Sequence, residues 1–522
     1  MVGGGIVGAG VARDAALRGL KVALVERGDF AQGTSSRSSK MVHGGLRYLE
    51  SRAFRLVSEA CAERRVLQRL APHLVRPRSF VLPAYAGERP SRFEVALGLW
   101  LYDAMAVFRN TRMHRGLSAE RLAAMEPALR RDGLAGGGLF FDCVTDDARL
   151  TLANALDAAA LGAAVSNYVE LRAVDVEAGE VRGAVVADRR EGTEFLVRAR
   201  CIVNAAGPWS DEVARMADPS AKPRLRLTKG VHVVVPRHRL GHIRALVLRT
   251  PQDHRVFFAL PWGPLSLVGT TDTDFEGAVS EPVAEAEDVR YLLKAVASYF
   301  PGADLTKDDV VGAYAGLRPL MRLEGVDPSA VTREHEVSVG PRGFVSVVGG
   351  KLTTYRRMAA QVVDEAALSV GLRARRSGTS RRPLPGGRAV PAQPSAAASA
   401  LARRFSLSEE EADALYFLHG SEAPAVLEAS PLAKRALLVE GQPYLEASLV
   451  WGFSHERAVT LEDALCRRVP VAVRLRDGGA GLAQRAASIA GSAGGWDSAR
   501  RESEVEAFLK RVERENAWRR AI

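Results

Sequence analysis

The sequence predicts an α/β protein in which a βαβ unit at the N-terminus is completed by distant strand-rich segments and followed by an all-α C-terminal domain. A glycine-rich turn stands between an apolar start and a helical pattern, strand-like runs recur over residues 165–348, and helical apolar spacing dominates after residue 400. Of its 522 residues, 47% are hydrophobic and 25% charged, as in a folded protein of two or three domains.

The N-terminal unit begins with the turn GGGIVGAG over residues 3–10. A helical pattern follows over 11–20, and LKVALVE over 20–26 has the character of a buried strand. Only Met1 and Val2 precede the glycines, where a strand of about five residues is expected. Either the start of the chain is truncated or misassigned, or the sheet tolerates a very short first strand.

Gly3, Gly5 and Gly8 form the pattern G-x-G-x-x-G. The first glycine permits a tight turn, the second lets the backbone approach a pyrophosphate, and the third lets the helix pack closely on the strand. Glu26 ends the next strand, about 20 residues on, where a carboxylate can accept hydrogen bonds from ribose hydroxyls. Together these residues predict a dinucleotide-binding unit; the alternative is a glycine-rich turn with an acidic residue placed by chance.

Further strand-like segments are interleaved with this unit, which predicts a nucleotide domain wrapped with a mostly antiparallel substrate domain. They lie at residues 165–186, 195–203, 231–236, 256–260, 265–270 and 344–348. We therefore expect discontinuous domains. The nucleotide pieces are expected at about 1–80, 140–210 and 340–372, and the substrate pieces at about 81–139 and 211–339.

Residues 373–400 have the composition of a linker, because they are rich in Arg, Pro, Gly, Ser and Ala. After them, helical spacing predicts a helical domain over 401–522. Its helices are expected at 408–418, 432–439, 455–466 and 503–519.

The net charge of +11 comes largely from arginine, which suits phosphate or carboxylate ligands, anionic lipid and nucleic acid equally well. The four cysteines are far apart, so the sequence predicts neither a zinc site nor a disulfide framework but a reducing, cytosolic compartment. No signal peptide precedes the first motif, and no uncharged run reaches the roughly 20 residues of a bilayer span. The segment 95–108, interrupted by Asp103, is predicted to be a buried amphipathic helix or a contact with a membrane surface.

A loop rich in serine and threonine follows Glu26. Its hydroxyls, among them those of Thr34, Ser35 and Ser39, suit phosphate and polyol oxygens, although such a loop can also be merely solvated. A Gly-Gly turn then places His43 and Arg47 on either side of itself.

The order of several motifs resembles that of FAD-dependent glycerol-3-phosphate dehydrogenases, over nearly the whole chain. The motifs are GGGIVGAG, SSRSSKMVHGGLRYLE, FDCVTDDARL, VNAAGPW, TKGVHVVVP, GTTDTDF, AGLRPL, VTREH and VGGKLTTYR, with HERAVTLEDALCRR in the helical C-terminal part. The most diagnostic are SSRSSKMVHGGLRYLE and GGKLTTYR, which the wider amino-acid-oxidase-like flavoproteins do not share in this form.

The resemblance implies an FAD-binding Rossmann-like domain of the glutathione-reductase and amino-acid-oxidase type, with non-covalent FAD and no metal. It implies oxidation of sn-glycerol 3-phosphate to dihydroxyacetone phosphate, with electrons passed to a membrane quinone. Because no second nucleotide fingerprint is present, NAD is not expected as acceptor. A cytoplasmic protein, peripheral on the inner face of the cell membrane, would follow; a homodimer stays open and nucleic acid is not expected as a partner.

A phosphorylated polyol requires cations that converge on it. Arg47, Arg318, Arg333 and Lys351 each lie inside one of these motifs, and arginine suits bidentate recognition of phosphate. The resemblance implies that Arg47 and Lys351 face the phosphate and that Arg318 and Arg333 lie near the reacting carbon. Each residue alone could be an ordinary surface charge.

Oxidation of the secondary alcohol requires a base for the hydroxyl proton. His232 is the first candidate, since a neutral imidazole can accept a proton near pH 7, and His43 is the second. His232 could instead be an ordinary strand residue. Arg318 could polarise the hydroxyl and stabilise the alkoxide, and Thr270 is a candidate hydrogen-bond partner for substrate.

The remaining candidates concern the cofactor. Gly349 and Gly350 end a strand and open a helix over 352–368, whose positive end would meet the pyrimidine edge of the flavin. By resemblance, the residues expected to contact FAD are Gly3, Gly5, Gly8, Glu26, Thr34, Ser35, Ser39, Lys40, Val169, Ala206, Gly207, Gly350, Lys351, Leu352 and Thr353.

Three alternative functions stay open at this point. An oxidase that passes electrons to oxygen would share these sites and would release peroxide. An amine or amino-acid oxidase would need a carboxylate clamp but not four cations. A catalytically silent paralogue, suggested by the short first strand, would take up no FAD.

Overall fold

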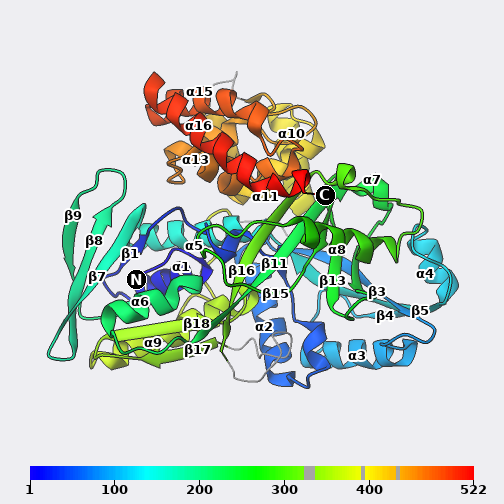
Figure 1. The fold of residues 1–522 in the computed structure, drawn as a ribbon, viewed down its shortest axis with the longest axis horizontal. Helices are drawn as coiled ribbons and strands as arrows, with labels where there is room; N and C mark the ends of the chain where they lie inside the picture. The colour runs from blue at the N-terminus through cyan, green and yellow to red at the C-terminus, as the bar shows by residue number, and fades with distance from the viewer. Residues whose placement is uncertain (323–334, 389–393, 431–434, 522) are drawn as a thin grey trace.

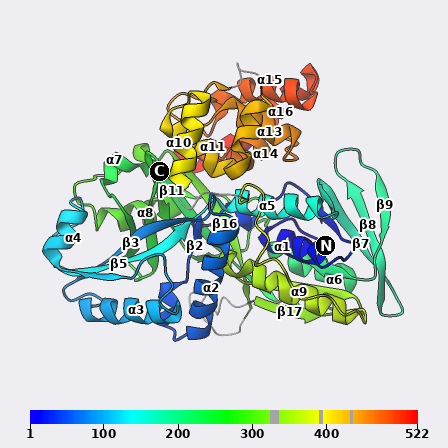
Figure 2. The ribbon, with the colours of Figure 1, turned by 180° about the vertical axis from the view of Figure 1, so that it is seen from behind.

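The computed structural model describes residues 1–322, 335–388, 394–430 and 435–521. Three parts lie next to one another (Figure 1). The N-terminal βαβ unit and its partner strands form one side, a large, mostly antiparallel sheet forms the other, and the C-terminal helices lie against both. Seen from behind (Figure 2), α1 (Ile6–Leu17) lies between α5 (Asp147–Ala160) and α9 (Tyr355–Ser369).

The nucleotide part is built on a mainly parallel sheet. β1 pairs with β6, and β10 pairs with β18, both in parallel, while β17 is antiparallel to β18. The strands are β1 (Ala23–Glu26), β6 (Ala164–Asn167), β10 (Ile202–Asn204), β17 (His335–Val339) and β18 (Phe344–Gly349). A parallel sheet with helices against it is the architecture predicted from the sequence.

Val2 takes the place of a full first strand. It forms isolated bridges to Val25 of β1 and to Asn204 of β10, and so joins the two halves of the sheet. Its N–H donates to the Val203 carbonyl, and its own carbonyl accepts from the N–H of Ala205, both at 2.9 Å. The sheet is therefore continuous through a strand position one residue long.

Beside this sheet lies a small antiparallel sheet of β7 (Val169–Glu177), β8 (Glu180–Asp188) and β9 (Glu194–Arg198). The helix α6 (Ser210–Ala217) contacts both β7 and β18. Val213 of α6 packs in one apolar core with Leu171 and Val186. Three short 3-10 turns bring loops toward the nucleotide part: η1 (Thr34–Ser36), η3 (Gly207–Trp209) and η5 (Leu352–Thr354).

The substrate part is one large sheet centred on β11, which pairs in antiparallel fashion with β14, β15 and β16. Its strands are β2 (Met41–Val42), β3 (Arg76–Tyr85), β4 (Arg115–Leu117), β5 (Leu134–Val144), β11 (Leu225–Pro236), β12 (Ala245–Arg249), β13 (Val256–Trp262), β14 (Leu265–Gly269), β15 (Thr273–Asp274) and β16 (Gly312–Met321). Only the β12–β3 pair among them is recorded as parallel in the described chain. The sheet is thus mostly antiparallel, as expected.

Helices cover this sheet. They are α2 (Phe54–Leu70), α3 (Arg92–Met105), α4 (Ala119–Met125), α7 (Arg237–Leu240) and α8 (Ala286–Ala297). Val289 and Leu292 of α8 pack against Val231 and Val233 of β11 in one buried core. The opposite face of β11 is turned toward the nucleotide part. On that side Gly316, in the paired strand β16, lies against Arg37.

The C-terminal domain is helical. It contains α10 (Pro394–Phe405), α11 (Glu409–His419), α12 (Ala423–Glu428), α13 (Glu446–Ser454), α14 (Leu461–Asp463), α15 (Ala483–Gly494) and α16 (Ser498–Glu515), with the π-helical turn η8 (Ala464–Arg468). Buried ion pairs join it to the nucleotide part. Arg467 and Arg468 both bind the carboxylate of Asp29, and Arg149 binds Glu456 with both terminal nitrogens.

All six strand-like segments read from the sequence contain strands, although 165–186 covers parts of three strands and 195–203 parts of two. The segment 373–388 has no helix or strand but is packed, with Leu384 buried and Arg382 bound to Asp157 at 3.1 Å. Helix α10 begins at Pro394, inside the span expected to be a linker. The helix expected at 432–439 lies partly outside the described residues, and 435–439 contain no α-helix. The domain boundaries remain a prediction.

Candidate active site

The glycine-rich turn adopts the geometry that a dinucleotide site needs. Gly3 has a φ of +103°, and a Cβ on it would lie 2.6 Å from the carbonyl oxygen of Ala205. A Cβ on Gly8 would lie 1.9 Å from the carbonyl oxygen of Gly3, so that any side chain there would separate helix from strand. Helix α1 starts directly after its N-cap residue Gly5, which has no side chain that could bond to the first turn of the helix. Its first N–H groups therefore point toward the turn.

Glu26 ends β1, as the sequence predicts. Its two carboxylate oxygens accept hydrogen bonds from the backbone N–H groups of Gly4 at 2.6 Å and of Gly28 at 2.9 Å. Burial raises the pKa of Glu26, although these two hydrogen bonds act in the opposite direction. Each oxygen keeps further acceptor capacity, which a ribose diol can use.

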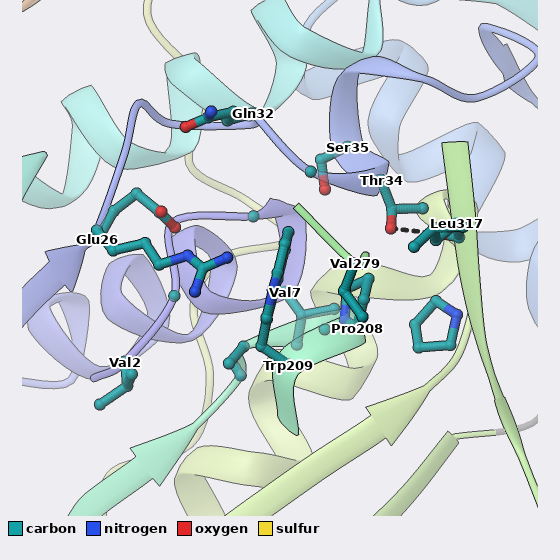
Figure 3. A pocket seen from close by; sticks show the side chains of 18 of the residues that line it. Val2, Val7, Glu26, Gln32, Thr34, Ser35, Pro208, Trp209, Val279 and Leu317 are labelled. Atoms are coloured by element: carbon teal, nitrogen blue, oxygen red, sulfur yellow. Dashed lines mark hydrogen bonds between the residues drawn. The ribbon is translucent and has the colours of Figure 1, made fainter. Parts of the chain in front are cut away.

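A cavity of about 510 Å³ begins at this turn (Figure 3). Of the expected cofactor residues, it is lined by Gly3, Gly5, Glu26, Thr34, Ser35, Val169, Ala206, Gly207, Gly350, Lys351 and Leu352. Trp209 also lines it and stacks under Arg27, whose guanidinium carbon is 4.2 Å from the ring centroid. These residues alone come from five separate stretches of the chain.

The serine- and threonine-rich loop divides into two parts. Ser35 accepts a hydrogen bond from the N–H of Ile6 at 2.9 Å, and Thr34 donates to the carbonyl of Leu317 at 2.6 Å, the contact drawn in Figure 3. Ser39 and Lys40 make other contacts and do not line this cavity: Lys40 binds Asp147 at 2.6 Å in a buried ion pair. The Thr34 contact ties the nucleotide loop to β16, one residue before Arg318.

The cavity is also lined by Gly349, the last residue of β18, and by Gly350, which have positive φ of +74° and +91°. The chain then forms η5 and enters α9 at Tyr355 rather than at Leu352, so a 3-10 turn precedes the predicted helix. Thr353 lies outside the cavity lining and bonds both to the N–H and to the carbonyl of His43.

Arg318 is fixed in place from three sides. Its terminal nitrogens donate to Asp272 Oδ1 and Thr270 Oγ1, each at 2.9 Å, and to the Thr271 carbonyl at 3.1 Å. The guanidinium lies across Gly230, because a Cβ there would be 2.2 Å from Nη2. Burial lowers the pKa of Arg318, which the nearby charge of Arg47 lowers further and Asp272 raises.

Arg47 and Lys351 both lie against Tyr48. The guanidinium carbon of Arg47 is 4.8 Å from the Tyr48 ring centroid, and the Lys351 Nζ is 3.5 Å from it. Lys351 lines the cavity, whereas Arg47 and Arg318 are not among its lining residues; Arg47 is close enough to Arg318 for its charge to lower the pKa of Arg318. Arg333 lies outside the described residues.

His232 is buried between the two parts of the protein. Its Nε2 is 2.8 Å from Ser39 Oγ, and its ring stacks on Tyr314 with the centroids 4.9 Å apart. Among the described residues, its Nδ1 has no hydrogen-bond partner. Burial lowers the pKa of His232 well below its ordinary value, and the charges of Arg318 and Lys40 lower it further. The ring is thus neutral near pH 7.

His43 precedes the Gly-Gly turn. Its ring meets Phe258 edge-on at 6.4 Å, and its backbone is bound by Thr353. It therefore comes from the same loop as Arg47, on the side of η5, whereas His232 comes from the sheet.

Some residues of this region were not predicted. Tyr48 lies between the predicted cations Arg47 and Lys351. Asp272, which binds Arg318, follows Thr270 by two residues. Both could have been found from their position inside or beside the motifs. Arg37, Glu462 and Arg514 also line the cavity. The last two belong to the C-terminal helices, and no pattern in the sequence links those helices to a site near residue 3.

Comparison with known proteins agrees with this description of the site. The family model described as FAD dependent oxidoreductase matches residues 1–356, and the C-terminal domain of alpha-glycerophosphate oxidase matches residues 377–501. A protein named glycerol-3-phosphate dehydrogenase 2 from Mycobacterium bovis is 39% identical over 520 residues, covering 99% of this chain and 88% of the relative. The chain belongs to the FAD-dependent glycerol-3-phosphate dehydrogenase family.

Other members of the glycerol-3-phosphate dehydrogenase family are similar in sequence or structure. An aerobic glycerol-3-phosphate dehydrogenase of Staphylococcus aureus is 41% identical over 365 residues, which are 70% of this chain and 66% of the relative. The X-ray structure of the glycerol-3-phosphate dehydrogenase from Bacillus halodurans complexed with FAD has a TM-score of 0.79 at 30% identity. It covers 98% of this chain and 94% of that one.

The residues of this dehydrogenase-family chain fit FAD. The turn at Gly3 and Gly5, the start of α1 and the Glu26 carboxylate are suited to a pyrophosphate and a ribose. Val169 at the start of β7, and Gly350, Lys351 and Leu352 after β18, line the same cavity.

Proposed function

We propose that the protein oxidises sn-glycerol 3-phosphate to dihydroxyacetone phosphate, with hydride transfer to FAD and passage of the electrons to a membrane quinone. One observation carries this proposal: Arg47 and Lys351, from distant segments, both lie against Tyr48, Lys351 also lines the nucleotide cavity, and the charge of Arg47 acts on Arg318. Bound FAD would supply the hydride acceptor at its N(5).

Arg47 and Lys351 are proposed to bind the phosphate. Both contact Tyr48, and the terminal nitrogen of Arg47 donates to its hydroxyl at 2.9 Å, so the ring holds the two cations in a shared position. Charge-assisted hydrogen bonds to phosphate are stronger than those to a neutral hydroxyl. This pair therefore favours a phosphorylated polyol over the free polyol. Arg333 remains part of the proposal on the resemblance alone.

Arg318 is proposed to face the secondary hydroxyl. Because Asp272, Thr270 and the Thr271 carbonyl hold it, its orientation is fixed before substrate arrives. A buried, pre-oriented guanidinium stabilises negative charge that develops on an oxygen more strongly than water does. The hydroxyl of Thr270 is a second candidate for a contact with substrate.

His232 is proposed as the base that takes up the hydroxyl proton. Burial keeps its ring neutral, and Nδ1 is the ring nitrogen that no described residue occupies. The Ser39 hydroxyl and the stacked Tyr314 fix the ring plane. His43 is the alternative, and it lies on the loop that carries Arg47.

The turn at Gly349 and Gly350 is proposed to meet the pyrimidine edge of the flavin. Both residues have positive φ and line the cavity, and η5 and α9 begin shortly after them. Backbone N–H groups in such a position favour negative charge at that edge and so promote reduction. Glu26, Thr34 and Ser35 are proposed to hold the other half of the cofactor.

The electron acceptor and the location are proposed from the family. We infer a cytoplasmic protein peripheral on the inner face of the cell membrane, where a quinone is within reach. In the part of the chain that the structure describes, no helix is long and apolar enough to cross a bilayer. The net charge of +11 is compatible with an anionic membrane surface.

The reaction can be tested with purified, FAD-loaded protein, a water-soluble quinone analogue and sn-glycerol 3-phosphate under nitrogen. The proposal predicts one dihydroxyacetone phosphate formed per quinone reduced. Stoichiometric hydrogen peroxide in air with no quinone reduction would identify an oxidase instead. Turnover of amino acids but not of glycerol 3-phosphate would reject the proposed substrate.

A further inference from the structure

Helix α3 is apolar on two opposite faces, although it lies at the surface. Its inner face, with Val95, Leu99 and Tyr102, is buried against the large sheet. Its outer face carries Phe93 and Trp100, whose exposed fractions are 75% and 53%. A helix that is apolar all round is expected to be covered on both sides, by protein or by lipid.

The exposed apolar residues form one stripe. Phe93, Leu97 and Trp100 are spaced by four and three residues, which puts them on one side of the helix. The stripe continues past the helix end, because the ring of Phe108 packs edge-on against Trp100 with the centroids 6.3 Å apart. Val107 beside it is also exposed. We call Phe93, Leu97, Trp100, Val107 and Phe108 the α3 face.

Basic residues flank the α3 face at both ends. The exposed arginines between residues 89 and 115 are Arg89, Arg92, Arg109, Arg112 and Arg115. The same span holds two acids. Asp103 is buried and binds His114, while Glu94 is held at the helix start, where its carboxylate accepts from the N–H of Ser91 at 2.7 Å.

This pattern fits a lipid surface better than a protein partner. Tryptophan and phenylalanine on one side of a helix, with five exposed arginines and one exposed acid, Glu94, in the same span, are the features of a helix that lies in the interface of a bilayer. The arginines would meet lipid phosphates while the rings enter the acyl region.

We propose that the α3 face is where the protein docks on a bilayer that contains anionic phospholipid. This inference deepens the proposed function, since a quinone acceptor is dissolved in the bilayer. The face also lies close to the candidate site: η2 (Leu46–Leu49), which carries Arg47, packs on α3, with Leu46 and Leu49 against the core that contains Leu99. In Figure 1, α3 and the C-terminal helices lie on opposite sides of the molecule.

The role of the apolar side chains of the α3 face in membrane binding can be tested by sedimentation. The FAD-loaded protein is mixed with vesicles of phosphatidylcholine and phosphatidylglycerol in equal amounts. Trp100→Glu should weaken the partition into these vesicles by at least roughly 10-fold, because it places a charge among the inserted side chains. Phe195→Glu is the matched control: Phe195 is 48% exposed, on β9 at the far end of the molecule, and its variant should bind like the parent.

The charged part requires a second pair of variants. Arg109→Gln with Arg112→Gln should weaken binding roughly 30-fold, since each basic residue near an anionic surface strengthens binding about fivefold. Arg290→Gln with Arg403→Gln, both exposed elsewhere, is the control that should have no effect. Vesicles of phosphatidylcholine alone should bind the parent protein weakly.

Each variant is also assayed for reduction of a soluble dye by glycerol 3-phosphate, which does not require a membrane. Unchanged dye reduction with lost vesicle binding supports the docking face. Vesicle binding that survives in both the Trp100 and the double arginine variants overturns it, as does a Trp100→Glu variant that converts a dimer into a monomer while it still binds vesicles. Absence of dye reduction in the parent protein would reject the proposed function and leave the vesicle result interpretable.

Discussion

The guanidinium of Arg318 lies against the carboxylate of Asp272, with Nη1 2.9 Å from Oδ1. The two side chains come from different segments, β16 and the loop after β14, so the ion pair crosses β11, with which both of these strands pair. Asp272 thereby fixes which nitrogens of Arg318 face Thr270 and which remain for a substrate.

Asp272→Asn should impair the reaction without loss of FAD. The amide keeps the shape but loses a charge-assisted hydrogen bond of about 1.5 kcal/mol, so kcat/KM for glycerol 3-phosphate should fall roughly 10-fold. Asp274→Asn is the matched control, because Asp274 pairs with Arg226 near the surface. In an Arg318→Ala background, Asp272→Asn should cause little further loss; two full and additive effects would show that Asp272 does not act through Arg318.

His232 can be tested through pH. Its pKa lies well below the ordinary value of histidine because of burial and the charges of Arg318 and Lys40, so the ring stays neutral as the pH falls through about 6.5. His232→Gln should lower kcat/KM by roughly 100-fold or more. The ratio of parent to variant kcat/KM cancels titration of the substrate phosphate, and it should stay constant from pH 8 to about pH 6.

A ratio that halves near pH 6.5 would mean that the base has an ordinary pKa, contrary to this account. A ratio close to one at every pH would remove His232 from the reaction. In that case His43→Gln should show the large loss instead, which makes the two candidates distinguishable in one series.

The sequence predicted the parts of the fold that have a strong local signal. The glycine turn, the strand that ends at Glu26 and the apolar strand around His232 all appear where expected. Strands β3 and β5 were not anticipated, because β3 contains Pro77 and Pro83 and β5 contains a Gly-Gly-Gly run. Those glycines are required by packing: a Cβ on Gly138 would lie 2.1 Å from Leu99 of α3.

Glu26 should contribute to FAD affinity. Glu26→Ala removes the proposed acceptor for the ribose hydroxyls and also the partner of the Gly4 and Gly28 N–H groups. The dissociation constant for FAD should rise about 10- to 100-fold, measured by fluorescence titration of the apoprotein. Glu212→Ala, an exposed residue at the same cavity, should bind FAD as the parent does. Equal affinity in both variants would contradict the role of Glu26.

The C-terminal domain should depend on Asp29 for its attachment. Asp29→Asn leaves the buried Arg467 and Arg468 without their shared carboxylate, which should cost about 3–5 kcal/mol. Limited proteolysis should then release this domain at a lower urea concentration. Asp413→Asn is the control, since it breaks the half-exposed Arg76–Asp413 pair, which joins the C-terminal domain to β3 of the large sheet, and should cost less than about 1 kcal/mol. Equal sensitivity of the two variants would count against the buried pair.

The candidate site was only partly accessible from the sequence. Motifs place Arg47, Arg318 and Lys351 in separate segments, and nothing local shows that a tyrosine between them brings two of these cations together. Likewise, Glu462 and Arg514 line the cavity because the C-terminal domain packs against residues that come hundreds of positions earlier in the chain. Long-range packing of this kind leaves no periodic trace in the chain.

The most direct test of the account is anaerobic reduction of the bound flavin. In the parent protein, sn-glycerol 3-phosphate should bleach the flavin absorbance completely, whereas glycerol and amino acids at equal concentration should not. Arg318→Ala should keep its yellow FAD and bleach at least about 100-fold more slowly. Bleaching by glycerol as fast as by its phosphate, or rapid bleaching of Arg318→Ala, would contradict a site in which gathered cations recognise a phosphorylated polyol beside the flavin.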